Sequence, residues 1–371
     1  MKRPKALFLC NEKFLDANIN TGGVKLCTDE FKALLKTAFT LEDFSVSYAY
    51  NLLYRLKSKL GVGAYEDYNI SHFKASLEDK IKKEQIQYVF LNLSNTASFS
   101  KLLKSIHPEV RVILCSHGNE SGDFLHETVM HQKYRGFRKN AAYYNLGKML
   151  ASESEFRQCI DLVLTVSDVE AEVEKWLGAK NIYMVPRVID KQCLEENTII
   201  GRIGFVSDLS HEPNFYGINE LCKAIVASGK TAPEIRLVGG GDNRGNQLAQ
   251  RYNFVNQLGY LTEEEMKKEL STWTFALNPV FYYSRGVSTK LGKCLGLGIP
   301  VITTAIGMRG YSWLEGELPI SKSKNEMADQ CIKLSRDETA IQYYREEVKR
   351  IQTSTPKHMK MMEDILDLLH H

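Results

Sequence analysis

The sequence has no CxxC pair, no long apolar run, no GxGxxG motif and almost no net charge. Its eight cysteines are scattered along the chain, which excludes a zinc ribbon or a thioredoxin motif and is typical of reduced, mostly buried thiols in a cytosolic enzyme. No stretch approaches the roughly 18 apolar residues that cross a membrane, and the apolar run at residues 6–10 is too short for a signal peptide. We therefore expect a cytoplasmic protein, bound at most to the inner face of a membrane.

The charge balance excludes a further class of protein, and the length predicts the number of domains. Lys and Arg number 48 and Asp and Glu 45, so the net charge of +3 disfavours a globally basic nucleic-acid binder. Apolar residues make up 43% and charged residues 25%, the proportions of an ordinary globular protein. At about 150 residues per domain, the 371 residues predict two domains.

Short apolar runs alternate with helical patterns along most of the chain. The runs lack the in-and-out alternation of half-exposed strands, so they predict buried parallel strands in an α/β fold with helices on both sheet faces. In the first half they are residues 6–10, 86–93, 111–115, 162–166 and 182–185, and in the second half residues 202–206, 235–238, 254–258, 275–278 and 300–304.

The polar stretch 190–198 separates the two series of strands. We predict two doubly wound, Rossmann-like domains, 1–192 and 198–340, followed by a helical segment 341–371 that packs back on the first domain. Pro356 should kink or divide that segment. Ligands bind beyond the carboxyl ends of strands in such sheets, which predicts a central cleft between the two domains.

Two glycine loops follow predicted strands. Gly22 and Gly23 precede a helical pattern, and Gly240 lies within a run of three glycines after residues 235–238. Loops of this kind let backbone N–H groups approach an anion, but a tight connection between a strand and a helix explains them equally well. Neither loop has the acidic residue of a dinucleotide site, which disfavours a bound NAD.

The most informative segment runs from residue 284 to 293. Its glycine and hydroxyl residues predict a turn that opens a helix, whose first N–H groups and positive dipole end can hold a diphosphate. Arg285, Lys290 and Lys293 add three cations and no acid. A solvated basic helix face is the alternative. The turn consists of Gly286, Val287, Ser288 and Thr289.

The order of these segments resembles a GT-B glycosyltransferase, with glycosyltransferase family 4 as the nearest match. Each segment is degenerate, but their order and spacing are specific. The segments that carry the resemblance are residues 21–23, 115–118, 161–167, 185–190, 205–206, 212–214, 237–241, 259–265 and 286–300.

The resemblance implies an enzyme that uses neither a metal nor a cofactor. Such an enzyme moves a sugar from a nucleotide-sugar donor to a glycan or lipid-linked glycan, in bacterial-type surface polysaccharide or glycoconjugate synthesis. By the resemblance, the donor lies on the second domain: the helix start at Ser288 and Thr289 holds the diphosphate, and Tyr260 and Leu261 contact the base. The resemblance also implies that the Gly22 loop closes over the phosphates and the donor sugar.

The sequence departs from the family at two positions. The family carries two glutamates separated by seven residues, and the corresponding residues here are Arg285 and Lys293. Arg binds carboxylates in a bidentate manner, so an acidic donor sugar, such as a uronic or ulosonic acid, is one interpretation. Stronger diphosphate binding and lost activity are the alternatives.

Three residues after residues 111–115 are candidates for catalysis. By the resemblance, His117 corresponds to a histidine near the donor sugar. Glu120 and Asp123 follow it and could deprotonate an acceptor hydroxyl if the reaction inverts the anomeric configuration. Whether the enzyme retains or inverts stays open.

Two other functions fit the same architecture. A nucleotide-sugar epimerase would turn over the donor without an acceptor. A catalytically silent subunit would bind or activate a partner transferase.

Residues 52–60 and 133–148 combine cations with aromatic or apolar residues. These two segments suit an anionic bilayer or a polyanionic acceptor, or else pack on their own sheet.

Overall fold

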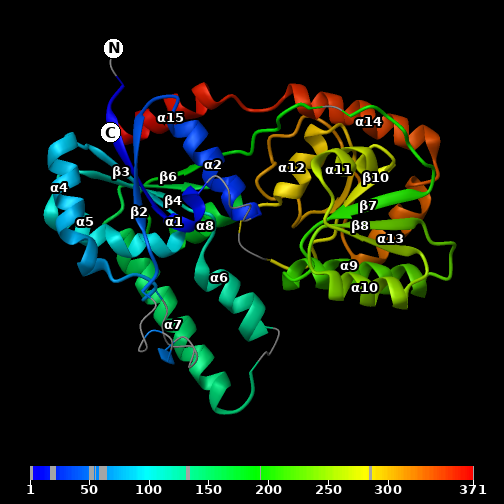
Figure 1. Ribbon diagram of the computed structural model, residues 1–371, viewed down its shortest axis with the longest axis horizontal. Helices are drawn as coiled ribbons and strands as arrows, with labels where there is room; N and C mark the ends of the chain where they lie inside the picture. Colours follow the sequence, from blue (N-terminus) through cyan, green and yellow to red (C-terminus); the bar gives the residue numbers. More distant parts are fainter. Residues whose placement is uncertain are drawn as a thin grey trace. The chain divides into compact units, whose positions relative to one another are not determined.

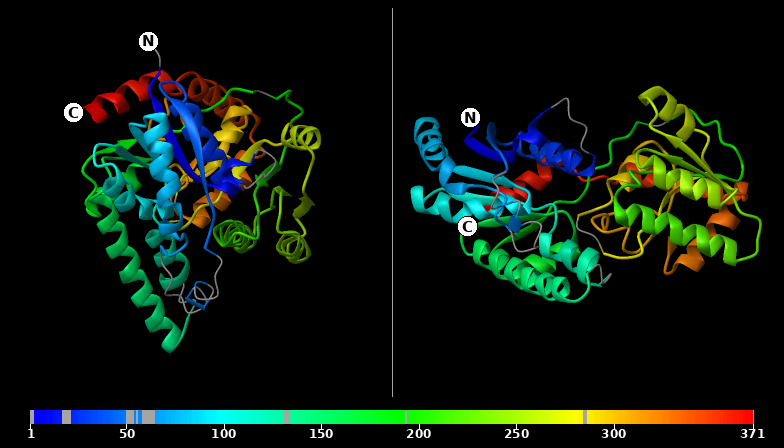
Figure 2. Two further views of the ribbon diagram at one scale, coloured as in Figure 1. Left: turned by 60° about the vertical axis from the view of Figure 1, so that its left-hand side comes forward. Right: turned by 60° about the horizontal axis from the view of Figure 1, so that its bottom comes forward.

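The computed structural model describes residues 3–16, 22–49, 54, 56–57, 65–130, 134–192, 194–283 and 286–370. The chain forms two compact units. Unit 1 comprises Met1–Val185, Ser284–Gly286 and Lys357–His371, and unit 2 comprises Pro186–Tyr283 and Val287–Pro356. In each unit, helices cover both faces of a parallel sheet (Figures 1 and 2).

The sheet of unit 1 has six parallel strands in the order β2-β1-β3-β4-β5-β6. Its central strands are almost entirely buried, as expected for a sheet covered on both faces. The strands are β1 (Lys5–Asn11), β2 (Thr40–Val46), β3 (Tyr88–Asn92), β4 (Arg111–Cys115), β5 (Leu162–Thr165) and β6 (Ile182–Met184).

The core of unit 1 lies between the sheet and its helices. Leu7 and Leu9 of β1 share one apolar cluster with Leu77 of α4 and Phe99, because alternate side chains of a strand point to the same face. The helices are α1 (Glu12–Leu15), α2 (Gly23–Leu35), α4 (Lys74–Glu84), α5 (Ser100–Ile106), α6 (Glu120–Phe124), α7 (Phe137–Arg157), α8 (Asp168–Trp176) and α15 (His358–His370), with shorter turns at Ile70–Phe73, Ser94–Phe99 and Leu125–Met130.

The sheet of unit 2 also has six parallel strands, in the order β12-β11-β10-β7-β8-β9. The strands are β7 (Arg202–Val206), β8 (Glu234–Val238), β9 (Val255–Gly259), β10 (Phe275–Asn278), β11 (Val301–Thr304) and β12 (Ile320–Ser321). The helices are α9 (Glu212–Ala227), α10 (Asp242–Arg251), α11 (Glu263–Leu270), α12 (Thr289–Gly296), α13 (Lys324–Leu334) and α14 (Glu338–Thr353).

Two apolar clusters form on the two faces of the second sheet. Phe275 and Leu277 of β10 belong to the cluster under α9 and α13, whereas Ala276, between them, belongs to the cluster under α12 and α14. In both sheets the chain order reverses beside the first strand, β1 or β7. Loops that follow the strands at such a switch point are where doubly wound sheets bind ligands.

All ten predicted strands are present, and two further strands were missed. β2 lies at the edge of its sheet with Glu42 and Asp43 partly exposed, so it has no apolar run that a search for buried strands would find. β12 is only two residues long. The prediction that Pro356 divides the C-terminal helical segment is confirmed, because α14 ends at Thr353 and α15 begins at His358.

Candidate functional site

Hydrogen bonds fix the start of α12 in unit 2. Ser288 is the N-cap residue: its Oγ accepts a hydrogen bond from the Leu291 N–H (3.4 Å) and donates one to Asn278 Oδ1 (2.9 Å). Asn278 is the last residue of β10 and is fully buried. Because the first N–H groups of a helix have no acceptor within it, those of Thr289 and Lys290 are suited to an anion.

A tyrosine hydroxyl is inserted at the same helical turn. Tyr311 Oη donates a hydrogen bond to the Ser288 carbonyl (2.8 Å) and accepts one from the Gly292 N–H (3.1 Å). A Cβ atom at position 292 would lie 2.7 Å from this hydroxyl, so the glycine makes room for it. The first turn of α12 is thereby held by both Asn278 and Tyr311.

Lys290 extends from this turn toward the carboxyl end of β7. Its Nζ donates a hydrogen bond to Asn214 Oδ1 of α9 (2.6 Å) and lies 3.4 Å from Ser207 Oγ and 5.3 Å from the centre of the Phe205 ring. Burial lowers the pKa of Lys290 to about 8. In the described part of the chain, no carboxylate lies within ion-pair distance of this ammonium group. The charge of this lysine is thus met by neutral hydrogen-bond partners, Asn214 and Ser207.

The other predicted residues of this segment differ in their surroundings. Lys293 is exposed and lies in the last turn of α12. It is therefore one turn away from Lys290 and from the start of the helix. Thr289 and Val287 are half-buried. Arg285 lies outside the described residues. Of the three predicted cations, only Lys290 is shown beside the start of the helix.

The three glycines after β8 pack against the loop that follows β7. A Cβ atom at Gly239 would lie 2.3 Å from the Ser207 carbonyl oxygen, and one at Gly240 would lie 2.4 Å from Tyr260 Oη. Gly241 has a φ of +82°, which side chains rarely adopt. Close packing therefore explains this loop without a ligand, which is the alternative that the sequence left open.

Tyr260 and Leu261 follow β9 but are placed differently. Tyr260 is 78% exposed, with its hydroxyl over Gly240. Leu261 packs against the apolar cluster that contains Leu270 and Trp273. The tyrosine ring is thus accessible to a planar ligand, whereas the leucine side chain belongs to the core.

Gly286 is grouped with unit 1, apart from the rest of its segment. Its N–H donates a hydrogen bond to the carboxylate of Glu170 in α8, and its φ is +76°. A Cβ atom there would lie 3.0 Å from the carbonyl oxygen of His117.

The predicted glycine loop of unit 1 ends at α2. Gly22 is the N-cap residue of this helix, with a φ of +70° and open space where a Cβ atom would stand. Gly23, the first helical residue, is exposed. Backbone conformation therefore accounts for a glycine at 22, and the exposed helix start leaves room for an anion.

His117 is buried at the carboxyl end of β4. Its Nε2 lies 3.0 Å from Asn92 Oδ1, and its ring lies 5.5 Å from that of Phe31. The amide nitrogen of Asn92 donates hydrogen bonds to Thr28 Oγ1 (3.0 Å) and Cys10 Sγ (3.2 Å), so its oxygen faces the histidine. Because an amide oxygen can only accept, His117 Nε2 is the donor in this hydrogen bond.

Glu120 and Asp123 both lie in α6, a helix of five residues. Both are half-buried in its first turn, where a carboxylate is favoured by the helix dipole. Their placement is thus explained by the local helix.

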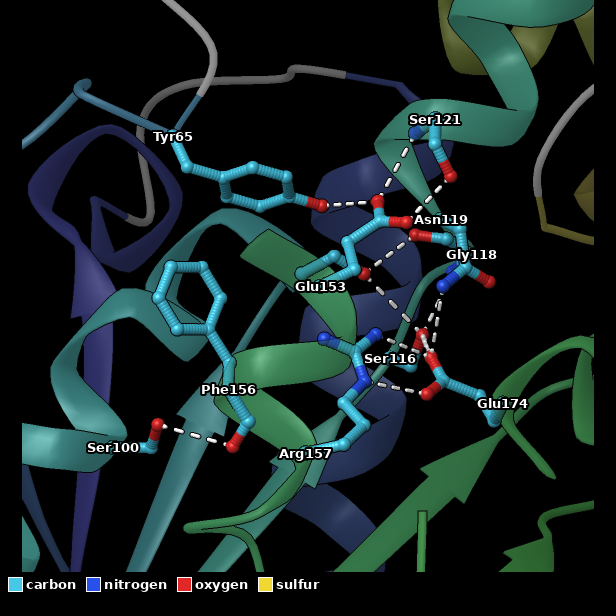
Figure 3. A network of polar contacts seen from close by, with 11 residues as sticks. Tyr65, Ser100, Ser116, Gly118, Asn119, Ser121, Glu153, Phe156, Arg157 and Glu174 are labelled. Atoms are coloured by element: carbon cyan, nitrogen blue, oxygen red, sulfur yellow. Dashed lines mark hydrogen bonds and ion pairs between the residues drawn. The ribbon is translucent and has the colours of Figure 1, made fainter. Parts of the chain in front are cut away.

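The loop that carries His117 rests on a buried ion pair (Figure 3). Arg157 of α7 makes two hydrogen bonds to Glu174 of α8, from Nε (2.6 Å) and Nη2 (2.7 Å), and both side chains are fully buried. Glu174 also accepts hydrogen bonds from Ser116 Oγ (3.4 Å) and Asn119 Nδ2 (3.2 Å). The residues on either side of His117 are therefore tied to one carboxylate.

A second buried carboxylate holds the end of the same loop. Glu153 accepts hydrogen bonds from the Ser121 N–H (3.0 Å), from Ser121 Oγ (2.5 Å) and from the Tyr65 hydroxyl (Figure 3). Burial raises the pKa of Glu153, although these hydrogen bonds oppose the shift. Together the two carboxylates hold residues 116–121 in place.

Sequence reasoning missed the residues that support both helix α12 and the His117 loop. Asn278 and Tyr311 carry no motif, and a buried tyrosine is expected in any core. Arg157 and Glu174 lie within helical patterns that carry no motif, so the sequence gives no reason to single them out. The spacing of Glu153 and Arg157, four residues apart, resembles that of a surface ion pair.

The described residues contain neither a cluster of metal ligands nor a helix able to span a membrane. No group of three or more His, Cys, Asp and Glu side chains is arranged there to hold a metal. None of the helices in this part of the chain combines the length and the apolar character needed to cross a bilayer.

The second sheet and most of its helices match a known family. Residues 201–337 match the family model described as Glycosyl transferases group 1. No curated protein matches the sequence.

Several solved structures resemble the whole chain at low sequence identity. Sucrose-phosphate synthase from Thermosynechococcus elongatus is 15% identical, with a TM-score of 0.71 over 99% of this chain and 98% of that chain. The lipopolysaccharide outer core galactosyltransferase WaaB is 12% identical, with a TM-score of 0.62 over 99% of each chain.

A third structure matches only in part. It is a mutant of S. aureus TarM in complex with fondaparinux, alpha-GlcNAc-glycerol and UDP, 15% identical, with a TM-score of 0.60 over 82% of this chain and 59% of TarM. At such identities the likeness establishes the fold. The chain has the α/β GT-B fold, and the family match over residues 201–337 supports an enzyme that transfers glycosyl groups.

Proposed function

We propose that the chain transfers a sugar from a nucleoside-diphosphate sugar to a glycan or lipid-linked glycan. The single observation that carries the proposal is Lys290, a half-buried cation with a lowered pKa at the start of a helix. Helix N–H groups and a cation at one point are the arrangement that binds a diphosphate.

The same groups would assist the chemical step. As the bond to the sugar breaks, negative charge develops on the departing diphosphate. The N–H groups of Thr289 and Lys290 and the Lys290 ammonium would stabilise that charge in the transition state. Tyr311 and Asn278 keep the helix start in place, so little reorganisation is needed when the donor binds.

The remainder of the donor would contact neighbouring loops of unit 2. Tyr260 presents an exposed ring at the end of β9, and an aromatic ring of this kind can stack on a nucleobase. Lys293 is exposed on α12 and would pair with the carboxylate of an acidic donor sugar.

The acceptor would bind to unit 1. His117 lies at the carboxyl end of β4, where its Nε2 contacts Asn92 Oδ1, and it is one candidate to act on an acceptor hydroxyl. Glu120 and Asp123 of α6 are the other candidates for this role, because both are half-buried close to the same loop.

Titration calorimetry with UDP, GDP, CMP and dTDP tests the donor site first. We expect one nucleotide to bind to the wild type, and Lys290→Met to weaken that nucleotide by about tenfold or more. Lys268→Met, which removes an exposed lysine of α11, serves as the matched control. No binding by any nucleotide would overturn the proposal and favour a silent subunit.

Transfer assays then separate neutral from acidic donors. The acidic-donor interpretation predicts turnover of a nucleotide-linked uronic or ulosonic acid and a loss with Lys293→Met that is confined to that donor. Exclusive use of a neutral hexose would refute it while leaving the transferase proposal intact. Donor turnover without any acceptor would instead identify an epimerase.

A further inference from the structure

The N-terminal half of α7 presents an exposed surface of aromatic and basic side chains. Phe137 is 80% exposed, Tyr144 67% and Tyr143 47%. Residues seven apart lie on the same side of a helix, so Phe137 and Tyr144 form one apolar stripe. Arg138 and Lys139 are exposed beside it. These five side chains are called the α7 surface below.

The helix extends beyond the sheet of unit 1 at this end. Figures 1 and 2 show α7 as a long helix whose first turns lie away from the strands. Its C-terminal half, in contrast, is packed inward, where Glu153 and Arg157 are fully buried. Ala142 and Asn145, on the packed side of these first turns, are buried, whereas the aromatic rings on the other side lie in solvent.

Along the sequence of α7 and the residues just before it, the charge has one sign. The sequence contains no acidic residue between positions 128 and 152, and it holds Lys133, Arg135 and Lys148 in addition to the two cations of the surface. Farther along the helix, Lys148 pairs with Glu66 (2.6 Å), and Glu66 also pairs with Lys57 (2.6 Å). That carboxylate is thus shared by two lysines and does not neutralise the surface.

Large exposed rings together with cations suit one kind of partner. A polyanionic chain without stacking bases is bound mainly through cations, and the small net charge disfavours a nucleic acid. An anionic bilayer attracts cations to its headgroups and also takes aromatic rings into its interfacial layer. We propose that the α7 surface binds the anionic surface of a lipid bilayer.

The contributions of the cations and of the rings set the expected change in affinity for the membrane. Each cation near an anionic membrane surface strengthens binding by roughly fivefold. Burial of the two rings adds at least about another tenfold. The described helices do not span a bilayer, so the contact is peripheral and reversible.

Another segment was predicted to share in this contact. The sequence expectation included residues 52–60, but only Tyr54, Leu56 and Lys57 of that range are described. The proposal therefore rests on α7 alone. It does not depend on the glycosyl-transfer proposal, because its test uses neither donor nor acceptor.

Sedimentation of the full chain with vesicles tests the inference. We expect binding to phosphatidylcholine vesicles that contain phosphatidylglycerol, weaker binding to phosphatidylcholine alone, and a decrease with added salt. The double variant Phe137→Ser/Tyr144→Ser should bind at least about tenfold more weakly. Arg138→Glu/Lys139→Glu should lose measurable binding.

Two matched variants distinguish the α7 surface from general surface properties. Lys82→Glu/Lys83→Glu makes the same charge change on α4, where both lysines are exposed. Trp176→Ser removes a ring that is 71% exposed on α8. Both should bind vesicles like the wild type.

Three results would overturn the proposal. They are a wild type that does not sediment with anionic vesicles, an aromatic double variant that binds as tightly as the wild type, and control variants that lose binding equally. If the aromatic variant binds like the wild type while the charge variant does not, the surface recognises negative charge alone, and the role proposed for its rings in the bilayer is refuted. Since all substituted side chains are exposed, thermal melting should remain unchanged in every variant.

Discussion

The hydroxyl of Tyr311 joins the two ends of the first turn of α12, because it donates to the Ser288 carbonyl at 2.8 Å and accepts from the Gly292 N–H at 3.1 Å. A side chain from another loop thus sets the geometry of the helix start that would face a diphosphate. The arrangement explains why position 292 is a glycine, and it makes the orientation of the helix N–H groups sensitive to Tyr311.

Tyr311→Phe should weaken nucleotide binding through this geometry. Removal of the hydroxyl leaves the Ser288 carbonyl and the Gly292 N–H with less hydrogen bonding, which should lower the free energy of unfolding by about 1–2 kcal/mol. We expect nucleotide affinity to fall by about three- to tenfold, measured by calorimetry. Tyr343→Phe, which removes an exposed hydroxyl bound to Glu317, should leave the affinity unchanged. Equal affinities for both variants would show that Tyr311 has no positioning role.

Substitution of Lys290 should have a larger effect than substitution of Lys293. Lys290 is half-buried beside Asn214, whereas Lys293 is exposed to solvent. Lys290→Met should reduce the affinity for a nucleoside diphosphate by about 10- to 100-fold. Lys293→Met should change it by less than about threefold, because solvent screens an exposed charge. The reverse ranking would place the diphosphate elsewhere.

Nucleotide binding should depend on pH near the pKa of Lys290. Burial lowers that pKa to about 8, and a bound anion would raise it, because the charged form then gains a partner. Affinity should therefore be constant well below pH 8 and decrease as the pH rises above it. Calorimetry in buffers of different ionisation enthalpy should detect proton uptake at pH 8 that Lys290→Met abolishes. A wild type that binds equally at pH 7 and pH 9 would contradict this linkage.

The buried pair of Arg157 and Glu174 should dominate the stability of unit 1. Arg157→Met leaves Glu174 as a buried charge without its cation, which should lower the free energy of unfolding by about 3–5 kcal/mol. The double variant Arg157→Met/Glu174→Leu should recover much of that loss, because the uncompensated charge is gone. Lys82→Met, which breaks the exposed pair with Glu78, should cost less than about 1 kcal/mol. Denaturant unfolding measures all three. A loss with Arg157→Met no larger than that with Lys82→Met would refute the assignment.

The strands and the helix at 289 could be predicted from the sequence for a simple physical reason. A strand buried on both faces needs a continuous apolar run, and residues 275–278 or 301–304 meet that need locally. The start of α12 carries its own signal, because Ser288 acts as an N-cap through its own side chain. β2 was missed because an edge strand carries no such run.

The supports of the candidate site could not be predicted, because each depends on residues far apart in the chain. Ser288 meets Asn278 ten residues away and Tyr311 23 residues away. The His117 loop meets Glu153 and Glu174 through the packing of α7 and α8. Only the folded chain brings these groups together. Arg285, which the sequence singled out, lies outside the described residues, so its role stays a prediction.

The position of Trp273 gives the protein an internal fluorescent probe. The ring is fully buried, its indole N–H is bonded to Glu269 (3.0 Å), and it lies against Gly204 so closely that a Cβ atom there would be 2.1 Å from it. Trp176, in the other unit, is largely exposed. Emission at short wavelength therefore comes from unit 2, and its shift to the red during denaturation would report the loss of that unit's core while the emission of Trp176 stays nearly constant.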